Sequence, residues 1–342
     1  MNIIANDGYT EKIKIYDLFC GPGIYKDGGE GSPFVLLRAI NRLHEVNPAK
    51  NTSIPPIDVL FNDDEPTRIA SLQQEIAREN LYHPKFGELR IVSKKYLVIL
   101  PEVISEINAL KKEKAFVFID PYGYSDIKGT DIKKLLASKK SEVLLFLPVQ
   151  FMYRFGNKGT PQALIDFRND IGLWQSSKNI GEFIDHLKDG FSKHLGNGFY
   201  VDTFTIRKDA VTVFCLFFFS SHIRGFEKML DAKWKMDKEQ GQGWSYEMQN
   251  TASLFMEQRN NPLAEKLRNF LKEAKTNVEI YEFTVKNGFL PTFANEILKN
   301  WKNSGILQVE SARQEKIRRG AFYIDYKYYK LNDVICKIKV IN

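Results

Sequence analysis

The sequence predicts a doubly wound α/β fold followed by a smaller helical unit. Three observations predict it: a buried strand that runs directly into a glycine turn near the N-terminus, short apolar strands that alternate with amphipathic helices up to residue 147, and helix-rich, basic sequence in the last quarter. With 342 residues, 43% of them hydrophobic, the chain can bury a sizeable core, and its length suggests about two domains.

The opening strand is expected at residues 13–17, and it leads into the turn Gly21-Pro22-Gly23. Glycine lets a backbone close tightly round a small cofactor, and a side chain at either glycine would block that approach. Ser32 and Pro33 then offer an N-cap with proline at the first helical position, so a helix should begin there. Strand, glycine turn and helix together are typical of the first unit of a nucleotide-binding sheet.

Four further strands, separated by helices, are expected before residue 150. Helices of this length between strands imply right-handed crossovers and therefore a parallel sheet. Residues 150–198 read as a mostly helical insertion, after which two strands lie close enough in the sequence to form an antiparallel hairpin. The predicted strands are 57–61, 89–92, 115–119 and 143–147, then 200–206 and 211–219, with helices opening near Pro66, Pro101 and Asp131.

The C-terminal part, residues 262–342, predicts a winged-helix module, with the domain boundary after residue 261. Its expected elements are helices at 262–274, 279–286 and 292–303, and strands at 306–309 and 322–331 around a loop at 311–320. This part holds 15 Lys+Arg against 9 Asp+Glu, whereas residues 1–261 hold 34 against 33. Such a bias indicates a polyanion partner, although a winged helix can equally dock a protein. The candidate phosphate contacts in the loop are Arg313, Lys316, Arg318 and Arg319.

Three strand ends carry the candidate chemistry, because ligands of an open α/β sheet collect beyond the carboxyl ends of its strands. The first runs from Asp17 to Gly23. At the second, Asp63 or Asp64 could accept hydrogen bonds from two ribose hydroxyls. The third is the run Asp120-Pro121-Tyr122-Gly123, which follows a nearly continuous apolar strand.

Taken together, these strand ends resemble those of class I S-adenosylmethionine-dependent methyltransferases. The Asp-x-Phe-x-Gly-x-Gly run at 17–23 is similar to that family's first motif, and the final antiparallel strand pair is similar to its usual finish. The resemblance implies a seven-stranded Rossmann-like sheet and S-adenosylmethionine as cofactor. The contacts that it implies are Asp17, Phe19, Cys20, Gly21, Pro22, Gly23 and Tyr25, then Asp63 or Asp64 on the ribose and Ser93 near the adenine.

More narrowly, the whole chain resembles the three-Cys-motif partner proteins. The resemblance lies in residues 17–23, 31–33, 118–124 and 231–235 and in the C-terminal winged helix. It implies a neighbouring-gene protein with a three-cysteine motif as a partner. The chain's own cysteines, Cys20, Cys215 and Cys336, lie far apart without metal-ligand spacing, so no metal site is predicted.

The third strand end bears on the reaction. Asp120-Pro121-Tyr122-Gly123 resembles the motif of methyltransferases that act on exocyclic amines of nucleic-acid bases, where the carboxylate and the proline carbonyl hold the amine and the aromatic ring stacks on the base. The resemblance implies Asp120, Pro121 and Tyr122 as the catalytic residues. The same four residues also suit an ordinary turn, but their position after a central strand favours function. A cofactor-binding regulator or partner-docking protein without catalysis stays open as the alternative.

Other classes of site fit the sequence less well. For NAD binding, Lys26 replaces the third glycine, and the acidic strand end comes about 40 residues after the turn instead of roughly 20. A phosphate loop would need Gly-Lys-Ser/Thr, and a metal nuclease built on Asp63, Asp64 and Asp120 would need a Glu-x-Lys on an adjacent strand. In the insertion, Tyr153, Arg154, Phe155 and Lys158 could line a substrate channel by stacking.

No segment of the sequence reads as a membrane or export signal. The longest apolar run, residues 211–219, is far shorter than the roughly 20 residues of a membrane helix, and residues 1–10 lack the apolar stretch of a signal peptide. We therefore expect a cytoplasmic protein.

Overall fold

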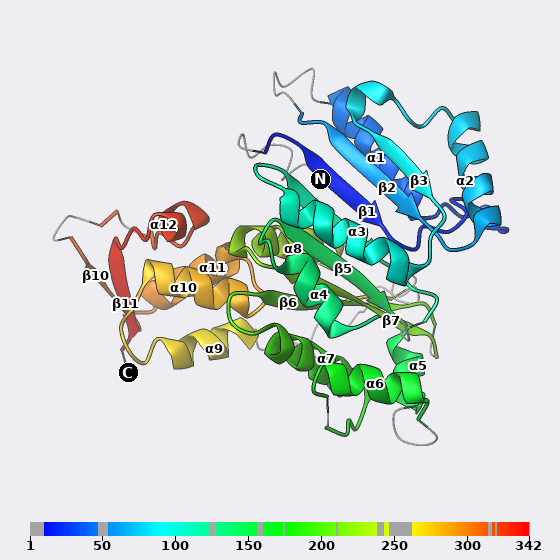
Figure 1. Ribbon diagram of the computed structural model, residues 1–342. Coiled ribbons are helices and arrows are strands. Elements are labelled where there is room, and N and C mark those ends of the chain that lie inside the picture. The colour runs from blue at the N-terminus through cyan, green and yellow to red at the C-terminus, as the bar shows by residue number, and fades with distance from the viewer. Residues whose placement is uncertain are drawn as a thin grey trace. The chain divides into compact units, whose positions relative to one another are not determined.

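The structure is a computed structural model that divides by its internal contacts into two compact units, Met1–His222 and Ile223–Asn342 (Figure 1). The residues that it describes are 10–46, 54–123, 127–155, 160–173, 175–209, 211–237, 243–245, 262–313, 317–318 and 320–341.

Seven strands of the first unit form one sheet in the order β3-β2-β1-β4-β5-β7-β6. Strands β1 to β5 pair in parallel, while β7 runs antiparallel to both β5 and β6. The predicted five parallel strands and terminal hairpin are thereby confirmed. Their bounds are β1 Ile13–Asp17, β2 Ile57–Asn62, β3 Leu89–Val92, β4 Lys114–Ile119, β5 Ser141–Leu147, β6 Tyr200–Arg207 and β7 Val213–Ser220.

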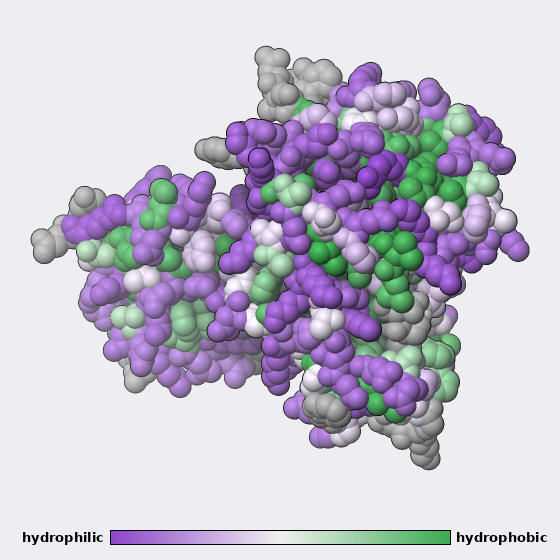
Figure 2. All heavy atoms as spheres, viewed as in Figure 1, coloured by the Kyte–Doolittle hydropathy of each residue, from purple (hydrophilic) through white to green (hydrophobic). Residues whose placement is uncertain are grey.

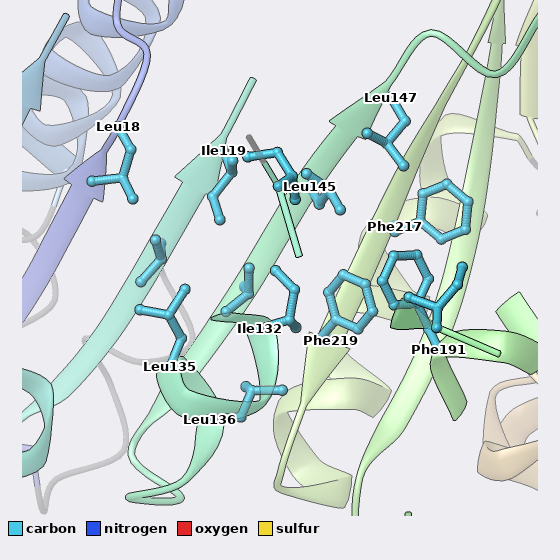
Figure 3. Close-up of a cluster of buried hydrophobic side chains, with 14 of the residues drawn as sticks. Leu18, Ile119, Ile132, Leu135, Leu136, Leu145, Leu147, Phe191, Phe217 and Phe219 are labelled. Carbon is cyan, nitrogen blue, oxygen red and sulfur yellow. The ribbon is translucent and has the colours of Figure 1, made fainter. Parts of the chain in front are cut away.

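Helices cover both faces of this sheet, because its central strands are apolar on both sides. In β1, Ile13 and Ile15 pack into a core with α1 and α2, whereas Tyr16 packs into a second core with α3, α4 and α7. Figure 3 shows part of the second core, where Leu136 of α4 and Phe191 of α7 face the strands. The helix bounds are α1 Ser32–Val46, α2 Pro66–Arg78, α3 Tyr96–Ala109, α4 Gly129–Leu136, α5 Val149–Phe155, α6 Gln162–Asp170 and α7 Ile180–Leu195.

Two helix starts differ from the prediction. Helix α3 begins at Tyr96, so Pro101 lies inside the helix and does not open it. Proline is tolerated there because it lies only in the second turn, where the carbonyl left without a donor belongs to the exposed Leu97. Ser32 is the first residue of α1, and its hydroxyl bonds to Asp17, so it does not act as the N-cap.

The second unit contains helices α8 to α12 and four short strands. Helix α8 belongs to it because Trp234 packs against Phe289 and Phe293, and its indole Nε1 donates to Gly288 O at 3.0 Å. The contacts thus divide the chain ahead of α8, while the predicted boundary after residue 261 lies outside the described residues and stays a prediction. The bounds are α8 Ile223–Met236, β8 Gly243–Ser245, α9 Pro262–Phe270, β9 Lys275–Thr276, α10 Asn277–Lys286, α11 Pro291–Asn303, β10 Leu307–Ser311, α12 Tyr326–Lys330 and β11 Cys336–Val340.

The prediction of a strand at 322–331 was wrong. Asp325 accepts a hydrogen bond from Lys327 N at 2.9 Å and thereby caps the short helix α12. The second long strand is β11, in which buried and exposed residues alternate, and it pairs antiparallel with both β10 and β9. The order along the chain is therefore helix, strand, helix, helix, strand, strand, from α9 to β11, with α12 inserted before the last strand.

Hydrophilic side chains cover most of the face shown in Figure 2. Within the part of the chain that the structure describes, no helix has the length and apolar character to cross a membrane.

Candidate functional site

The glycine turn after β1 is fixed to the strands on both sides of it. Leu18 N donates to Phe118 O of β4 at 3.1 Å, and Cys20 N donates to Asn62 O of β2 at 2.8 Å. Gly21 and Gly23 have φ angles of 65° and 81°, in the left-handed region that favours glycine. The turn is therefore held in place at the carboxyl edge of the sheet, where β1, β2 and β3 end side by side (Figure 1).

The two glycines serve different purposes. A Cβ at Gly23 would lie 2.6 Å from Leu72 Cδ1 and 2.9 Å from Phe34 Cε2, so this glycine is needed for packing against α1 and α2. A Cβ at Gly21 would meet nothing nearer than the Tyr122 hydroxyl, at 3.8 Å. Of the two glycines, only the buried Gly21 has space beside its Cα, so the expectation that both glycines leave room for a ligand applies to Gly21 alone.

Asp17 ends β1 as a buried carboxyl group. Its Oδ2 accepts a hydrogen bond from the Ser32 hydroxyl at 2.6 Å, and its Oδ1 accepts one from Phe19 N at 3.4 Å. The pKa of Asp17 is raised to about 7, chiefly by burial and to a smaller extent by the nearby charges of Asp120 and Asp63, against the lowering effect of these two donors. Asp17 therefore lies close to the carboxyl groups of the other two strand ends.

Asp63 follows β2 and anchors the turn. Its Oδ2 accepts from Gly21 N at 3.1 Å, and its Oδ1 accepts from Glu65 N at 3.0 Å and from the Arg68 guanidinium at 3.3 Å. The residue is only 1% exposed, whereas Asp64 is exposed. The sequence could not separate these two aspartates, and the structure gives them different surroundings.

The third strand end, after β4, lies beside the other two. Burial raises the pKa of Asp120 to about 6. Tyr122 is 68% exposed, and the Arg68 guanidinium lies 4.3 Å from the centre of its ring. Burial raises the pKa of Tyr25, and the carboxylates of Asp120 and Asp17 raise it further, so Tyr25 belongs to the same cluster.

The remaining predicted cofactor residues are less closely gathered. Cys20 is buried at the back of the turn, and burial raises the pKa of its thiol, so it behaves as a core residue. Phe19 stacks on Tyr96 with ring centroids 5.2 Å apart. Pro22 is half-buried in the turn, and Ser93 is exposed directly after β3.

Three residues that were not predicted to belong to the site complete it. Asn62 joins the strand ends, since its Nδ2 donates to Leu18 O and Lys94 O and its Oδ1 accepts from Lys94 N. The sequence signal that could have identified Asn62 is a polar residue at the end of an apolar strand. Ser32 contacts Asp17, 15 positions before it, and Arg68 contacts Asp63, five positions before it. The resemblance at 31–33 includes Ser32 without a role in the site, and no motif points to Arg68.

The charges at this edge favour a cationic ligand over an anionic one. Among the described residues, Arg68 is the one cation in hydrogen-bond or ion-pair contact with Asp17, Asp63 or Asp120. Asp63 and Asp120 beside a single guanidinium, with a partial charge from Asp17 because its pKa is about 7, leave an excess of negative charge that would repel a pyrophosphate. In addition, α1 begins only at Ser32, so the glycine turn is not followed directly by the helix N-terminus that a dinucleotide fold uses for phosphate.

The second unit has a separate basic groove of about 600 Å³. Lys299 and Lys302 of α11 and Arg318 after β10 line it, and all three are exposed. Along α11, Lys299 directly follows the buried Leu298, and Lys302 lies one turn beyond Leu298. Of the other predicted phosphate contacts, Arg313 forms an ion pair with Asp333, and Lys316 and Arg319 lie outside the described residues.

No family model and no curated protein matches the chain. It is similar in structure to the methyltransferase domain of bacterial CtHen1, with 11% identity, a TM-score of 0.31, and coverage of 64% of this chain and 93% of that one. It is also similar to the O-methyltransferase from Bacillus cereus solved with SAH (13%, TM-score 0.34, coverage 64% and 77%) and to a putative rRNA methylase from Clostridium thermocellum (10%, 0.29, 63% and 91%).

Similarity at this level carries no argument of its own, and the fold is assigned from the order and direction of the strands. Five parallel strands in the order β3-β2-β1-β4-β5, completed by the antiparallel β7 between β5 and β6, and helices on both faces, make up the sheet. The first unit therefore has the doubly wound, Rossmann-like fold of the class I methyltransferases.

Proposed function

We propose that this chain is an S-adenosylmethionine-dependent methyltransferase that acts on an exocyclic amine of a nucleic-acid base. The observation that carries the proposal is the convergence of Gly21, Asp63 and Asp120, from three different strand ends, at one edge of the sheet. The motifs add support for kinship with the three-Cys-motif partner proteins, and for a cytoplasmic protein whose partner is encoded nearby.

The residues at this edge suit S-adenosylmethionine. The cofactor carries a positive sulfonium and an amino group, which match the excess of carboxyl groups at Asp17, Asp63 and Asp120. The open side of Gly21 would take the ligand, and Asp63 or the more exposed Asp64 would accept from the ribose hydroxyls. When bound, the cofactor supplies an activated methyl group, so the protein has to position the acceptor more than to activate it.

The chain's own residues would hold the amine in place. Asp120 has a pKa of about 6, so its carboxylate is ionised at neutral pH and accepts a hydrogen bond from the amine, as would the carbonyl of Pro121. The same carboxylate can take up the proton that the amine loses on methylation. The exposed ring of Tyr122 offers a face on which a base can stack.

The second unit would hold the nucleic acid as a winged helix. The three helices α9, α10 and α11 and the antiparallel strands β10 and β11 support such a module, although α12 lies where its second strand was expected, and α11 would be its recognition helix. The groove lined by Lys299, Lys302 and Arg318 supports phosphate contacts.

Transfer of a radiolabelled methyl group to mixed DNA and RNA tests the proposal. We expect Asp120→Asn to lower the rate at least about 100-fold while leaving S-adenosylhomocysteine affinity unchanged, because the carboxylate acts on the acceptor. The wild-type rate should rise as pH rises through about 6, where Asp120 ionises. Asp189→Asn, an exposed aspartate on α7, is the matched control and should leave the rate unchanged.

One observation favours the second candidate function, a regulator that binds the cofactor without catalysis. Asp63 is already covered by Gly21, Glu65 and Arg68, so a ribose would have to share or displace these contacts. Binding of S-adenosylhomocysteine without transfer to any nucleic acid, unaffected by Asp120→Asn, would support this function and contradict the enzyme.

A further inference from the structure

The aromatic side chains that are exposed lie on segments following the carboxyl ends of the strands. Among the described residues, four tyrosine and phenylalanine side chains are exposed. Their exposed fractions are 51% for Tyr25, 68% for Tyr122, 49% for Phe151 and 39% for Phe155. Tyr25 lies in the loop after β1, Tyr122 lies after β4, and the two phenylalanines lie on α5, which follows β5. We call these four residues the aromatic edge.

The topology brings these segments together. Strands β4 and β5 are parallel neighbours, and Ile119 of β4 pairs with Leu145 of β5. Tyr122 lies three residues after Ile119, and α5 begins four residues after Leu145, so both segments leave the sheet from the same position along the two strands. Tyr122 and Tyr25 are close enough for their charges to interact, as are Tyr25 and Asp120. The rings of Phe151 and Phe155 lie 4.5 Å apart, one helical turn from each other.

Helix α5 exposes Phe151 and Phe155 while it buries other apolar side chains. Helix α5 already buries Val149 and Met152 completely on its other side. Leaving a phenylalanine half-exposed forgoes part of the roughly 1.5–3 kcal/mol that full burial of such a side chain contributes. Two exposed rings that lie against each other at 48°, on the helix that follows the strand next to β4, therefore indicate a surface that a ligand covers.

The chemistry of this surface favours unpaired nucleic-acid bases. A cation lies among the phenylalanine rings, since Arg154 is exposed between Phe151 and Phe155 on α5, whereas Arg68 over the ring of Tyr122 is already paired with Asp63. Aromatic rings interleaved with cations bind single strands by stacking on bases and attracting the backbone. A duplex hides the faces of its bases, so it would not use such a surface.

We propose that the aromatic edge binds a single-stranded stretch of nucleic acid, with Phe151 and Phe155 stacking on bases next to the one held at Asp120. The proposal rests on the proposed function and deepens it, because it names single-stranded substrate. The loss of either ring should remove stacking with a flanking base and leave the cofactor site intact.

Fluorescence anisotropy of the full chain with labelled DNA and RNA oligonucleotides of about 16 nucleotides tests this. We expect Phe151→Ala with Phe155→Ala to weaken single-strand binding at least tenfold, with the duplex unaffected. Phe151→Leu with Phe155→Leu keeps apolar bulk without an aromatic face and should show most of the same loss. Ile165→Ala, an exposed apolar side chain on α6, is the control and should change nothing.

An abasic oligonucleotide separates stacking from backbone attraction, and wild type and variant should bind it equally. Equal affinity of wild type and alanine variant for the normal single strand would overturn the proposal, as would an equal loss on the abasic strand. Titration of S-adenosylhomocysteine into wild type and every variant distinguishes failure of the proposed function from failure of the aromatic-edge proposal. Wild type that fails to bind it contradicts the proposed function, whereas unchanged cofactor affinity with unchanged single-strand affinity contradicts the aromatic edge alone.

Discussion

The two candidate binding regions of this chain use charge in opposite ways. At the carboxyl edge of the sheet, Asp17 and Asp63 are buried and Asp120 is half-buried, whereas Lys299, Lys302 and Arg318 of the basic groove are exposed. Burial moves the pKa values of carboxyl groups, and salt screens buried charges poorly but exposed charges well. The first region should therefore respond to pH and the second to ionic strength.

The largest expected effect is at the glycine turn of the first region, because its two glycines have different surroundings. Gly23→Ala places a Cβ 2.6 Å from Leu72 and in a left-handed conformation, so we expect it to lower the free energy of unfolding by about 3 kcal/mol or more. Gly21→Ala meets only the conformational cost, about 1 kcal/mol. Urea denaturation measures both, and equal losses would contradict the different roles of the two glycines.

Asp17 gives the first region its pH dependence. In the folded protein the carboxyl group of Asp17 keeps its proton up to a pH of about 7, whereas in the unfolded chain it loses the proton near pH 3.8. Between these two pH values the unfolded state therefore binds fewer protons than the folded state. Stability from this group is therefore present at low pH and lost as pH rises towards 7, by a few kcal/mol.

Asp17→Asn should remove that part of the dependence and stabilise the chain at pH 8 relative to wild type. Denaturation at several pH values gives the difference between the two proteins. A difference that stays constant from pH 4 to pH 8 would show that Asp17 is ionised throughout.

The basic groove should respond to salt with little change in stability. Because each phosphate contact contributes about 0.9 to the slope of log K against log salt on B-DNA, Lys299→Ala with Lys302→Ala should flatten the slope by about 2. Lys337 and Lys339 are exposed residues on β11 that alternate with its buried ones, so their alanine double variant loses the same charge elsewhere in this unit. Equal flattening by both pairs would mean that net charge matters and the groove does not.

Much of the fold and of the site could be predicted because each signal was local. The run of Asp17 to Gly23, the acidic pair before Pro66 and the Asp120 motif each follow a strand, and parallel strands bring their ends to one edge. The hairpin at β6 and β7 was equally local, because its two strands are joined by a short turn.

What the sequence did not reveal depends on tertiary contacts or on competing local signals. The placement of Arg68 over Tyr122 and the use of the Ser32 hydroxyl by Asp17 follow from how two helices meet the sheet. In the second unit, the tyrosine-rich run at 326–330 favours a strand by its composition, yet the cap at Asp325 starts a helix there. The alternation of β11 was the better strand signal.

The central claim is that the three strand ends form a site for a cationic nucleoside. Calorimetric titration of the full chain with S-adenosylmethionine and, separately, with NAD⁺ tests it most directly. The excess of carboxyl groups at Asp17, Asp63 and Asp120 predicts that S-adenosylmethionine binds, that Asp63→Asn weakens it, and that NAD⁺ does not bind. Binding of NAD⁺ in preference to S-adenosylmethionine, or of neither, would contradict the account.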